Sequence, residues 1–335
     1  MTFISPGVGW VLGLSLCGAK PCLRLAKTVD AGLSWNWIPG GNVSALSTFG
    51  QWQLRFADGD DGWISGPQLY STHDAGRTWT RIQFQGLDAP GSTVGALEAG
   101  DGRVYAEIPE ATDPNTYGPV VLFESPVTDD SWHPVSGVAT GWAGFAGNIS
   151  LAQGVFWVSL HPAVVTPEGS QALSTLYRSS NSLTWRSEPQ PCPSDSVATV
   201  AAATSVIDYV VCSGGLAAGS QEKSLYVSTN GGASYRLMTD PPLSGDFETV
   251  AASPGTVAVA ASSGATFVYS SFNGGLTWTT TATFGDGGLG LSDLGFTTPL
   301  QGVVIHGQPP YPESLQLLMT RDGGHTWGVV PVTPG

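Results

Sequence analysis

The 335-residue chain predicts an all-β fold, a seven-bladed β-propeller with four-stranded antiparallel blades. First, 45 glycines and 24 prolines separate short apolar runs, and no stretch shows sustained helical periodicity. Second, one eight-residue turn motif recurs along the whole chain. Third, the residues between its copies read as short strands, and a strand-built repeat of about 40–50 residues is typical of a propeller.

The turn motif has the pattern Ser/Thr-x-Asp/Asn-x-Gly-x-Ser/Thr-Trp/Tyr. Five copies keep it well: TVDAGLSW, THDAGRTW, STNGGASY, SFNGGLTW and TRDGGHTW. Two copies, SPVTDDSW and RSSNSLTW, are degenerate. The seven copies start near residues 28, 72, 125, 178, 228, 271 and 320. Seven units of about 48 residues therefore account for residues 1–335 as a single domain.

Each residue type in the motif suits a tight turn. A short Asp or Asn side chain accepts hydrogen bonds from backbone N–H groups, glycine permits φ > 0, and the aromatic ring packs beside the hairpin. One acid per motif is too few for a calcium site, so we expect a structural role. The residues concerned are Asp30, Gly32, Trp35, Asp74, Gly76, Trp79, Asn230, Gly232, Asn273, Gly275, Trp278, Asp322, Gly324 and Trp327.

The motif resembles the Asp-box, or BNR repeat, of sialidase-type propellers. That resemblance places each box between the third and fourth strands (C and D) of a blade whose strands are A to D. A second phrase precedes three boxes: FISPGVGWVLG from Phe3, FADGDDGWISG from Phe56 and FTTPLQGVVIHG from Phe296. Phrase and box together are similar to the Ycf48-like family of photosystem II assembly factors, which are seven-bladed propellers. No partner-binding motif of that family is found here, so only the architecture is carried over.

The B–C and D–A loops should share the face opposite the boxes, where such folds bind ligands. Four B–C loops are long and begin at Pro109, His161, Gly214 and His306, whereas two are short, at Gly66-Pro67 and Ser262–Gly264. Variable loops on one face predict a binding face, although long loops are also tolerated as insertions without function. The candidate ligand-binding residues are His161, Glu168, Glu222, His306, Tyr311 and Glu313.

The rival hypothesis is a glycoside hydrolase or lyase that uses paired carboxylates on the loops. Glu168 and Glu313 are its candidate catalytic residues, but the sequence assigns no residue as catalytic, and Glu107, Glu110, Asp113 and Glu222 are further loop acids. Sialidase activity is not expected, because the arginine motif near the N-terminus is missing. There is no metal motif, and GDGGLG (285–290) has no strand–helix context, so we expect neither metal nor cofactor.

Charge and cysteine content limit the kinds of partner and the cellular compartment that can be expected. A net charge of −14 with three lysines disfavours nucleic acid and anionic membranes. The four cysteines form two local pairs, Cys17–Cys22 and Cys192–Cys212, which predict two disulfides and an oxidising compartment. Four free thiols in a cytosolic protein are the alternative. No apolar run is long enough to span a bilayer, and a signal peptide, if the protein is secreted, is expected to be absent from this sequence.

These observations together predict a secreted or cell-surface, non-catalytic binding or scaffold module. We expect a monomer without cofactor that recognises a protein or glycan through its B–C loop face. The first and last units each supply their own four strands. The terminal blades are therefore expected to meet edge to edge, without a shared sheet.

Overall fold

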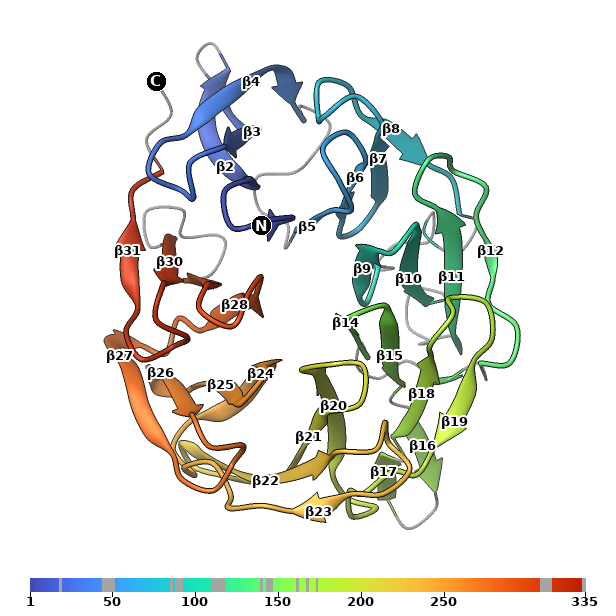
Figure 1. Cartoon of the computed structure of the whole chain (residues 1–335), viewed down its shortest axis with the longest axis vertical. Helices are drawn as coiled ribbons and strands as arrows, with labels where there is room; N and C mark the ends of the chain where they lie inside the picture. The colour runs from blue at the N-terminus through green and yellow to red at the C-terminus, as the bar shows by residue number, and fades with distance from the viewer. Residues whose placement is uncertain are drawn as a thin grey trace.

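The computed structural model of the protein describes residues 1–17, 20–43, 52–84, 87, 93–109, 119–138, 141–142, 147–160, 163–166, 169–172, 174–307 and 315–332. Its architecture is a ring of seven antiparallel blades around a central axis (Figure 1), which confirms the predicted fold class. In each blade the four main strands are hydrogen-bonded in chain order, from an inner strand A to an outer strand D.

The strands of the first four blades are as follows. Blade 1 contains β1 (Thr2–Phe3), β2 (Gly9–Cys17), β3 (Lys20–Thr28) and β4 (Asn36–Asn42). Blade 2 contains β5 (Gln53–Phe56), β6 (Gly62–Ser65), β7 (Leu69–Thr72) and β8 (Thr80–Ile82). Blade 3 contains β9 (Leu97–Gly100), β10 (Arg103–Pro109), β11 (Pro119–Pro126) and β12 (His133–Pro134), with β13 (Gly141–Trp142) also paired to β11. Blade 4 contains β14 (Asn148–Ala152), β15 (Val155–Leu160), β18 (Thr175–Ser179) and β19 (Arg186–Glu188).

The remaining strands form a side hairpin and three regular blades. The hairpin of β16 (Ala163–Thr166) and β17 (Gly169–Ala172) lies between β15 and β18 in the chain. Blade 5 contains β20 (Val197–Ala202), β21 (Asp208–Ala217), β22 (Ser220–Ser228) and β23 (Arg236–Leu237). Blade 6 contains β24 (Asp246–Ser253), β25 (Thr256–Ser262), β26 (Gly264–Ser271) and β27 (Thr279–Gly287). Blade 7 contains β28 (Leu291–Phe296), β29 (Gly302–His306), β30 (Gln316–Thr320) and β31 (Gly328–Val330).

The core is divided among the seven interfaces between neighbouring blades, which we call seams. One apolar cluster fills each seam, such as Tyr105 and Phe156 between blades 3 and 4. Strand B is the most buried, as in VFWVSL of β15, because both of its faces meet a neighbouring blade. Outer strands such as β31 are largely exposed. This gradient explains why apolar runs alternate with polar ones along each repeat.

The ring closes without a strand shared between the first and last blades, as predicted. The expected edge-to-edge contact is wrong, because the two blades meet through their faces. Val11 and Trp35 of blade 1 pack against Val303 and Met319 of blade 7 in the same kind of apolar cluster that fills the other seams. The seam between blades 7 and 1 is therefore held by side-chain packing.

The Asp-boxes share one set of hydrogen bonds. In the first box, the Gly32 amide donates to Thr28 Oγ1 at 2.9 Å, and the Ser34 amide and hydroxyl donate to the Asp30 carboxylate at 2.9 and 2.5 Å. The Ser34 hydroxyl and amide, together with Thr28, lower the pKa of Asp30 to about 2. The Ala31 amide donates to Gly7 O at 3.0 Å, which ties the box to the A–B turn of its own blade. These boxes and the A–B turns make one face of the molecule, the box face.

The box glycines also interlock neighbouring blades. A Cβ added at Gly76, Gly232 or Gly275 would lie 2.3 Å from a side chain of the preceding blade, namely Leu25, Trp157 and Leu225 respectively. These glycines have φ between +85° and +91°. Glycine is therefore required at these sites both for the turn and for the approach of the next blade.

The two degenerate boxes lack this glycine. In blade 4, the hydrogen bonds start at Ser179 rather than Arg178, and Asn181 Oδ1 accepts from the Thr184 amide at 2.9 Å. This turn is one residue shorter than the others, and Ser182 has φ = 58°. In blade 3, Asp129 accepts from the Ser131 amide at 2.8 Å.

Candidate functional site

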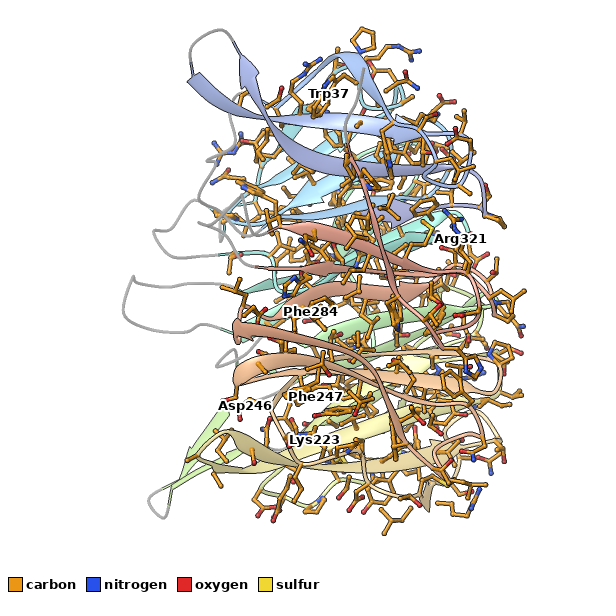
Figure 2. The ribbon with its side chains drawn as sticks, turned by 90° about the vertical axis from the view of Figure 1, so that its left-hand side faces the viewer. Trp37, Lys223, Asp246, Phe247, Phe284 and Arg321 are labelled. Atoms are coloured by element: carbon orange, nitrogen blue, oxygen red, sulfur yellow. A yellow bond between two sulfur atoms is a disulfide. The ribbon has the colours of Figure 1, made fainter. Side chains whose placement is uncertain are left out.

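A cavity of about 680 Å³ lies on the propeller axis and is lined by strand A of all seven blades. Each strand A begins at the face formed by the B–C and D–A loops, which we call the loop face, and ends at the box face. Figure 2 shows the two faces edge-on, with Asp246 near the loop face and Arg321 at the box face. The lining residues include both ends of β28, so the cavity extends along most of the axis.

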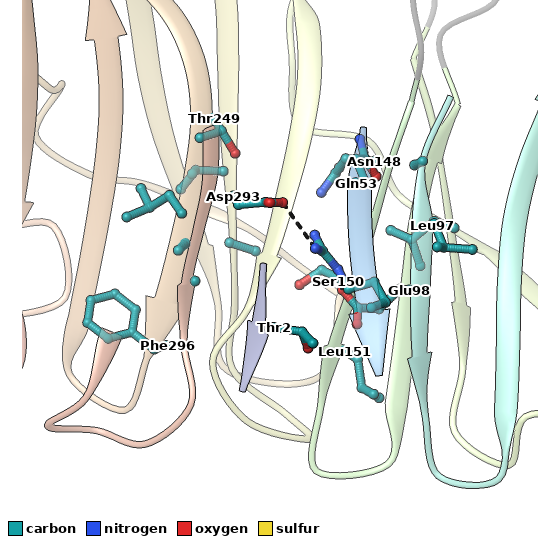
Figure 3. Close-up of a pocket in the computed structure, with 18 of the residues that line it drawn as sticks. Thr2, Gln53, Leu97, Glu98, Asn148, Ser150, Leu151, Thr249, Asp293 and Phe296 are labelled. Carbon is teal, nitrogen blue, oxygen red and sulfur yellow. Dashed lines mark hydrogen bonds and ion pairs between the residues drawn. The ribbon is translucent and has the colours of Figure 1, made fainter. Parts of the chain in front are cut away.

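An ion cluster crosses the middle of this cavity (Figure 3). Arg55 Nη1 of β5 lies 3.0 Å from Asp293 Oδ1 of β28, and Arg55 Nε lies 3.4 Å from Glu98 Oε2 of β9. The α-amino group of Met1 also contacts Asp293, at 2.5 Å. Burial alone would raise the pKa of Asp293, but this α-amino group and Arg55 hold it below its usual value. Arg55 Nη1 also donates to Met1 O at 3.4 Å, so Arg55 joins blades 2, 3 and 7 and contacts the start of blade 1.

A second polar cluster lies at the loop-face end of the seam between blades 6 and 7. Glu248 of β24 lines the cavity and accepts from Ser262 Oγ at 2.6 Å and from the Leu291 amide at 2.8 Å. Burial raises the pKa of Glu248. Asp286 of blade 6 pairs with His306 Nε2 of blade 7. The hydrogen bond from Leu291 to Glu248 and the pair of Asp286 with His306 cross the seam, so polar contacts cross-link the two blades at this end of the cavity wall.

His306 is enclosed at this seam. Its ring stacks on Phe284 with centroids 4.1 Å apart, and its side chain is only 7% exposed. Nδ1 is buried and has no hydrogen-bond partner among the described residues. Burial raises the pKa of Asp286, but the His306 ring, the Gly288 amide and Thr266 outweigh this and leave it lowered.

Glu107 lies at the loop-face end of the seam between blades 3 and 4. Its backbone pairs with strand A of its own blade, where the Gly95 amide donates to Glu107 O at 2.7 Å and the Glu107 amide donates to Ala96 O at 2.9 Å. Its side chain is fully buried, and within the described part of the chain no side chain hydrogen-bonds to either carboxyl oxygen. Burial raises the pKa of Glu107 to about 8, opposed only by the backbone amide of Gly147 in blade 4.

Two of the six candidate ligand-binding residues lie in described parts of the chain. His306 is the last residue of β29 and is buried, and Glu222 lies on β22 with an exposed side chain. The predicted long loop from Gly214 to Lys223 is wrong: β21 continues to Ala217, and β22 begins at Ser220. His161, Glu168, Tyr311 and Glu313 lie outside the described residues.

Several residues at the cavity were missed from the sequence. Four of the seven inner strands, β5, β9, β24 and β28, each place one charged side chain in the cavity lining with no motif around it, and the partners are separated by tens to hundreds of residues. The available signal was a charged residue inside a short strand expected to be crowded, as in QLRF, LEAG and LSDLGF. Asp286 was overlooked because its glycine-rich segment was judged only as a phosphate loop. The missed residues are Arg55, Glu98, Glu248, Asp286 and Asp293.

One of the two predicted disulfides is described. Cys192, in the D–A connection before blade 5, is bonded to Cys212 of β21, with Cα atoms 5.4 Å apart. In the other predicted pair, the Cys17 side chain lies outside the described residues. The described residues hold no group of three His, Cys, Asp or Glu side chains arranged to bind a metal ion. The same residues contain no helix long and apolar enough to cross a membrane.

Comparison with known proteins identifies a fold. No family model matches the chain, and no curated protein does. The structure of Ycf48 bound to a D1 peptide is 18% identical over 85% of this chain and 82% of that chain, with a TM-score of 0.53. The β-propeller domain of the Trilobed protease from Pyrococcus furiosus, which has an open velcro topology, is 7% identical over 98% and 95%, with a TM-score of 0.57. A family PL25 polysaccharide lyase, an ulvan lyase, is 11% identical over 96% and 91%, with a TM-score of 0.54.

These likenesses define the class of protein. The chain is a seven-bladed β-propeller, a fold that it shares with a protein solved with a bound peptide and with a carbohydrate-cleaving enzyme. At such low identity the shared fold does not carry a function with it. The function must therefore be argued from the site.

Proposed function

We propose that this protein is a non-catalytic binding module that holds a protein or glycan partner on its loop face, at the mouth of the central cavity. The observation that carries this proposal is that the acidic side chains on the cavity wall are already engaged by groups of the protein itself. A glycoside hydrolase needs one carboxylic acid to protonate the leaving group and a second carboxylate as base or nucleophile. Glu98 and Asp293 instead bind Arg55, and Glu248 accepts two hydrogen bonds from the protein.

The charge of the chain favours a cationic protein partner over an acidic glycan. The net charge is −14, and the described loop-face side chains include the exposed acids Asp195 and Glu222. Lys223, beside them, is buried, and its Nζ donates to three backbone carbonyls, so it offers no charge to a ligand. Electrostatic complementarity would speed association with a basic partner and exclude acidic ones. Ycf48, which shares the fold, has been solved with a bound peptide.

The cysteines favour an oxidising compartment. The Cys192–Cys212 disulfide joins a loop-face connection to strand B of blade 5. Such bonds persist in secreted and cell-surface proteins and are rare in the cytosol. We therefore place the proposed binding module outside the cytosol.

The test measures binding and turnover on the same samples. The purified protein is screened against neutral and acidic oligosaccharides and against basic and acidic peptides, while reducing ends and unsaturated products are followed. Binding without turnover supports the proposal. Turnover that disappears in Glu168→Gln or Glu313→Gln would contradict it and make the protein a glycoside hydrolase or lyase.

A pair of charge reversals locates the binding face. Glu222→Lys changes an exposed loop-face acid, and Asp60→Lys changes an exposed acid in an A–B turn on the box face. The proposal expects weaker binding for Glu222→Lys and unchanged binding for Asp60→Lys. The opposite pattern would place the partner on the box face.

A further inference from the structure

The box-face end of the seam between blades 2 and 3 lacks the glycine contact found at other seams. In the boxes of blades 2, 5 and 6, a glycine closely approaches a side chain of the preceding blade, as Gly76 does with Leu25. The degenerate box of blade 3, SPVTDDSW, has no glycine at this position. Polar side chains join the two blades here instead, because Ser71 Oγ of β7 donates to Asp130 Oδ2 of blade 3 at 2.7 Å.

His73, in the box of blade 2, adds a second contact to the same carboxylate. Its Nδ1 lies 2.6 Å from Asp61 Oδ1 in the A–B turn of its own blade, and its Nε2 lies 3.4 Å from Asp130 Oδ2. The ring meets the buried Trp63 edge-on, with an interplanar angle of 85°. The A–B turn is held by Asp58, whose carboxylate accepts from the Asp61 amide at 2.9 Å. One imidazole ring thus faces two carboxylates, one in its own blade and one across the seam.

This geometry selects the charged form of the ring. A neutral imidazole has one N–H donor and one lone pair, whereas the imidazolium ion has two N–H donors. Only the charged ring can therefore donate to Asp61 and Asp130 at once, since a neutral ring turns its lone pair toward one of the carboxylates. Because the contact of His73 with Asp61 is the shorter one, deprotonation breaks the contact with Asp130 across the seam.

The charges around the ring also favour its protonated form. The surrounding elements are the A–B turns and the boxes of blades 2 and 3, and most of their charged residues are acids. Burial lowers the pKa of His73, but its contacts with Asp61 and Asp130 outweigh this effect and leave the pKa above its ordinary value of 6.5. The charged residues of these elements are Asp58, Asp60, Asp61, His73, Asp74, Arg77, Asp101, Arg103, Asp129 and Asp130.

We propose that His73, Asp61 and Asp130 form a pH-sensitive clasp that joins blades 2 and 3 on the box face. With the ring charged, His73 holds both carboxylates and closes this end of the seam. Loss of the proton frees the box of blade 3 from His73, while the Ser71 hydroxyl still contacts Asp130. The clasp lies on the face opposite the proposed binding face, so this inference does not depend on the proposed function.

The pH range of the clasp follows from the linkage between proton binding and folding. Because the pKa of His73 is higher in the folded protein than in the unfolded chain, its stabilising contribution is fully present below about pH 6.5. That contribution is lost as the pH rises through the folded-state pKa. Burial raises the pKa of Asp61, with the His73 contact opposing it, so strong acid also weakens the clasp by protonating this carboxylate. The clasp is therefore strongest at mildly acidic pH.

A double-mutant cycle measured at two pH values tests the clasp. His73→Gln, Asp130→Asn and the double variant are unfolded in urea at pH 6 and at pH 9. We expect coupling between the two positions to change the unfolding equilibrium constant by about two- to fivefold at pH 6 and to disappear at pH 9. The matched control His325→Gln removes another exposed box-face histidine, which stacks on Phe272, and it should couple to Asp130→Asn at neither pH.

Amide hydrogen exchange adds a local measurement that a purely structural role of His73 would not change with pH. The Ser131 amide donates to Asp129 within the box that the clasp holds. Its protection, corrected for intrinsic exchange at each pH, should fall between pH 6 and pH 9 in wild type and stay constant in His73→Gln. Equal coupling at both pH values, or pH-independent protection of Ser131 in wild type, would overturn the proposal.

A wild-type titration keeps the proposal testable if His73→Gln does not fold. The ring nitrogens of histidine are labelled with ¹⁵N, and the His73 ring is assigned through its own backbone resonances. The clasp predicts a midpoint above 6.5 for this ring. A midpoint at or below 6.5 would contradict the clasp, because the two carboxylates would then not hold the charged form.

Discussion

Two seams of the same ring are built differently at their loop-face ends. Between blades 6 and 7, Asp286 pairs with His306, and Glu248 accepts from the Leu291 amide across the seam. Between blades 3 and 4, the corresponding region holds Glu107, which has no partner among the described side chains. At these ends, one seam is cross-linked by side-chain polar contacts, whereas the other packs around a buried acid that has no side-chain partner. The difference indicates that the ring does not need a side-chain cross-link at the loop-face end of every seam.

The box-face ends of these seams differ in the same direction. The box of blade 7 is intact, with the Gly324 amide donating to Thr320 Oγ1 at 2.8 Å. The box of blade 4 is one residue shorter, and Ser182 takes a positive φ without being glycine. The seam between blades 3 and 4 is thus less regular at both ends. A propeller scaffold can bear one weakened seam because each blade packs against two neighbours.

The largest expected effect is a change of stability with pH at Glu107. Its pKa in the folded state, about 8, is higher than its ordinary value of 4.5, so the folded state binds this proton more tightly. The associated stability is fully present below pH 4.5 and is lost as the pH rises through 8. Relative to wild type, Glu107→Gln should therefore gain about 4 kcal/mol in free energy of unfolding between pH 5 and pH 9. Urea unfolding at both pH values checks this, with Glu124→Gln as the control that keeps the wild-type profile.

Filling a box glycine should break an intact seam almost as severely. Gly232→Ala places a methyl group 2.3 Å from the Trp157 ring of blade 4 and also strains a φ of +85°. Gly324→Ala has the same backbone strain at φ +94°, but its methyl group meets Phe296 only at 3.5 Å. We expect a loss of about 3 kcal/mol for Gly232→Ala and about 1 kcal/mol for Gly324→Ala by chemical denaturation. Equal losses of stability in the two variants would show that backbone strain at positive φ, and not the clash with the neighbouring blade, causes most of the destabilisation.

Removing a polar cross-link should weaken the seam between blades 6 and 7 by less. His306→Ala deletes the partner of Asp286 and the ring that stacks on Phe284. We expect a loss of about 2 kcal/mol, because a buried hydrogen bond and some packing are removed. The control His133→Ala removes an exposed histidine that pairs within its own blade. Thermal unfolding that changes equally for both variants would refute the assigned cross-link.

The smallest effect should come from repairing the degenerate box of blade 4. Ser182 has φ = 58°, a conformation that costs less for glycine than for other residues. Ser182→Gly is therefore expected to stabilise the protein by about 0.5–1 kcal/mol. Its hydrogen bond from Tyr105 uses the Ser182 carbonyl and survives the change. A lower free energy of unfolding in urea would show that the Ser182 side chain itself stabilises the turn.

The fold could be predicted from sequence because its signal is local and repeated. The residues of an Asp-box hydrogen-bond to one another over four positions, as Gly76 does with Thr72. Each box can therefore be recognised from a short stretch of sequence. The absence of a sheet shared by the first and last blades could also be predicted, because each of these two repeats contains four strands of its own. The one-residue offset of the fourth box could not be predicted. Its sequence is degenerate, so only the hydrogen bonds show that the turn starts at Ser179 and is one residue shorter.

The cavity could not be predicted in the same way. The contact of Arg55 with Asp293 spans 238 positions, and that of Asn148 with Val200 spans 52. Nothing local marks such pairs. Glu107 was expected on the loop face but lies within β10. Its distinction is its lack of side-chain partners, which is a property of the assembled seam. A sequence pattern readily identifies a turn whose hydrogen bonds are local. It does not identify a buried group that lacks a hydrogen-bonding side chain.

The most direct test of the account is the ionisation of Glu107 itself. The carboxyl carbons of glutamate are labelled with ¹³C, their chemical shifts are followed from pH 3 to pH 10, and the resonance absent from Glu107→Gln is assigned to this residue. The burial of this carboxyl group predicts a midpoint near pH 8. A midpoint near the ordinary value of 4.5 would contradict the burial of this carboxyl group and its lack of a side-chain partner.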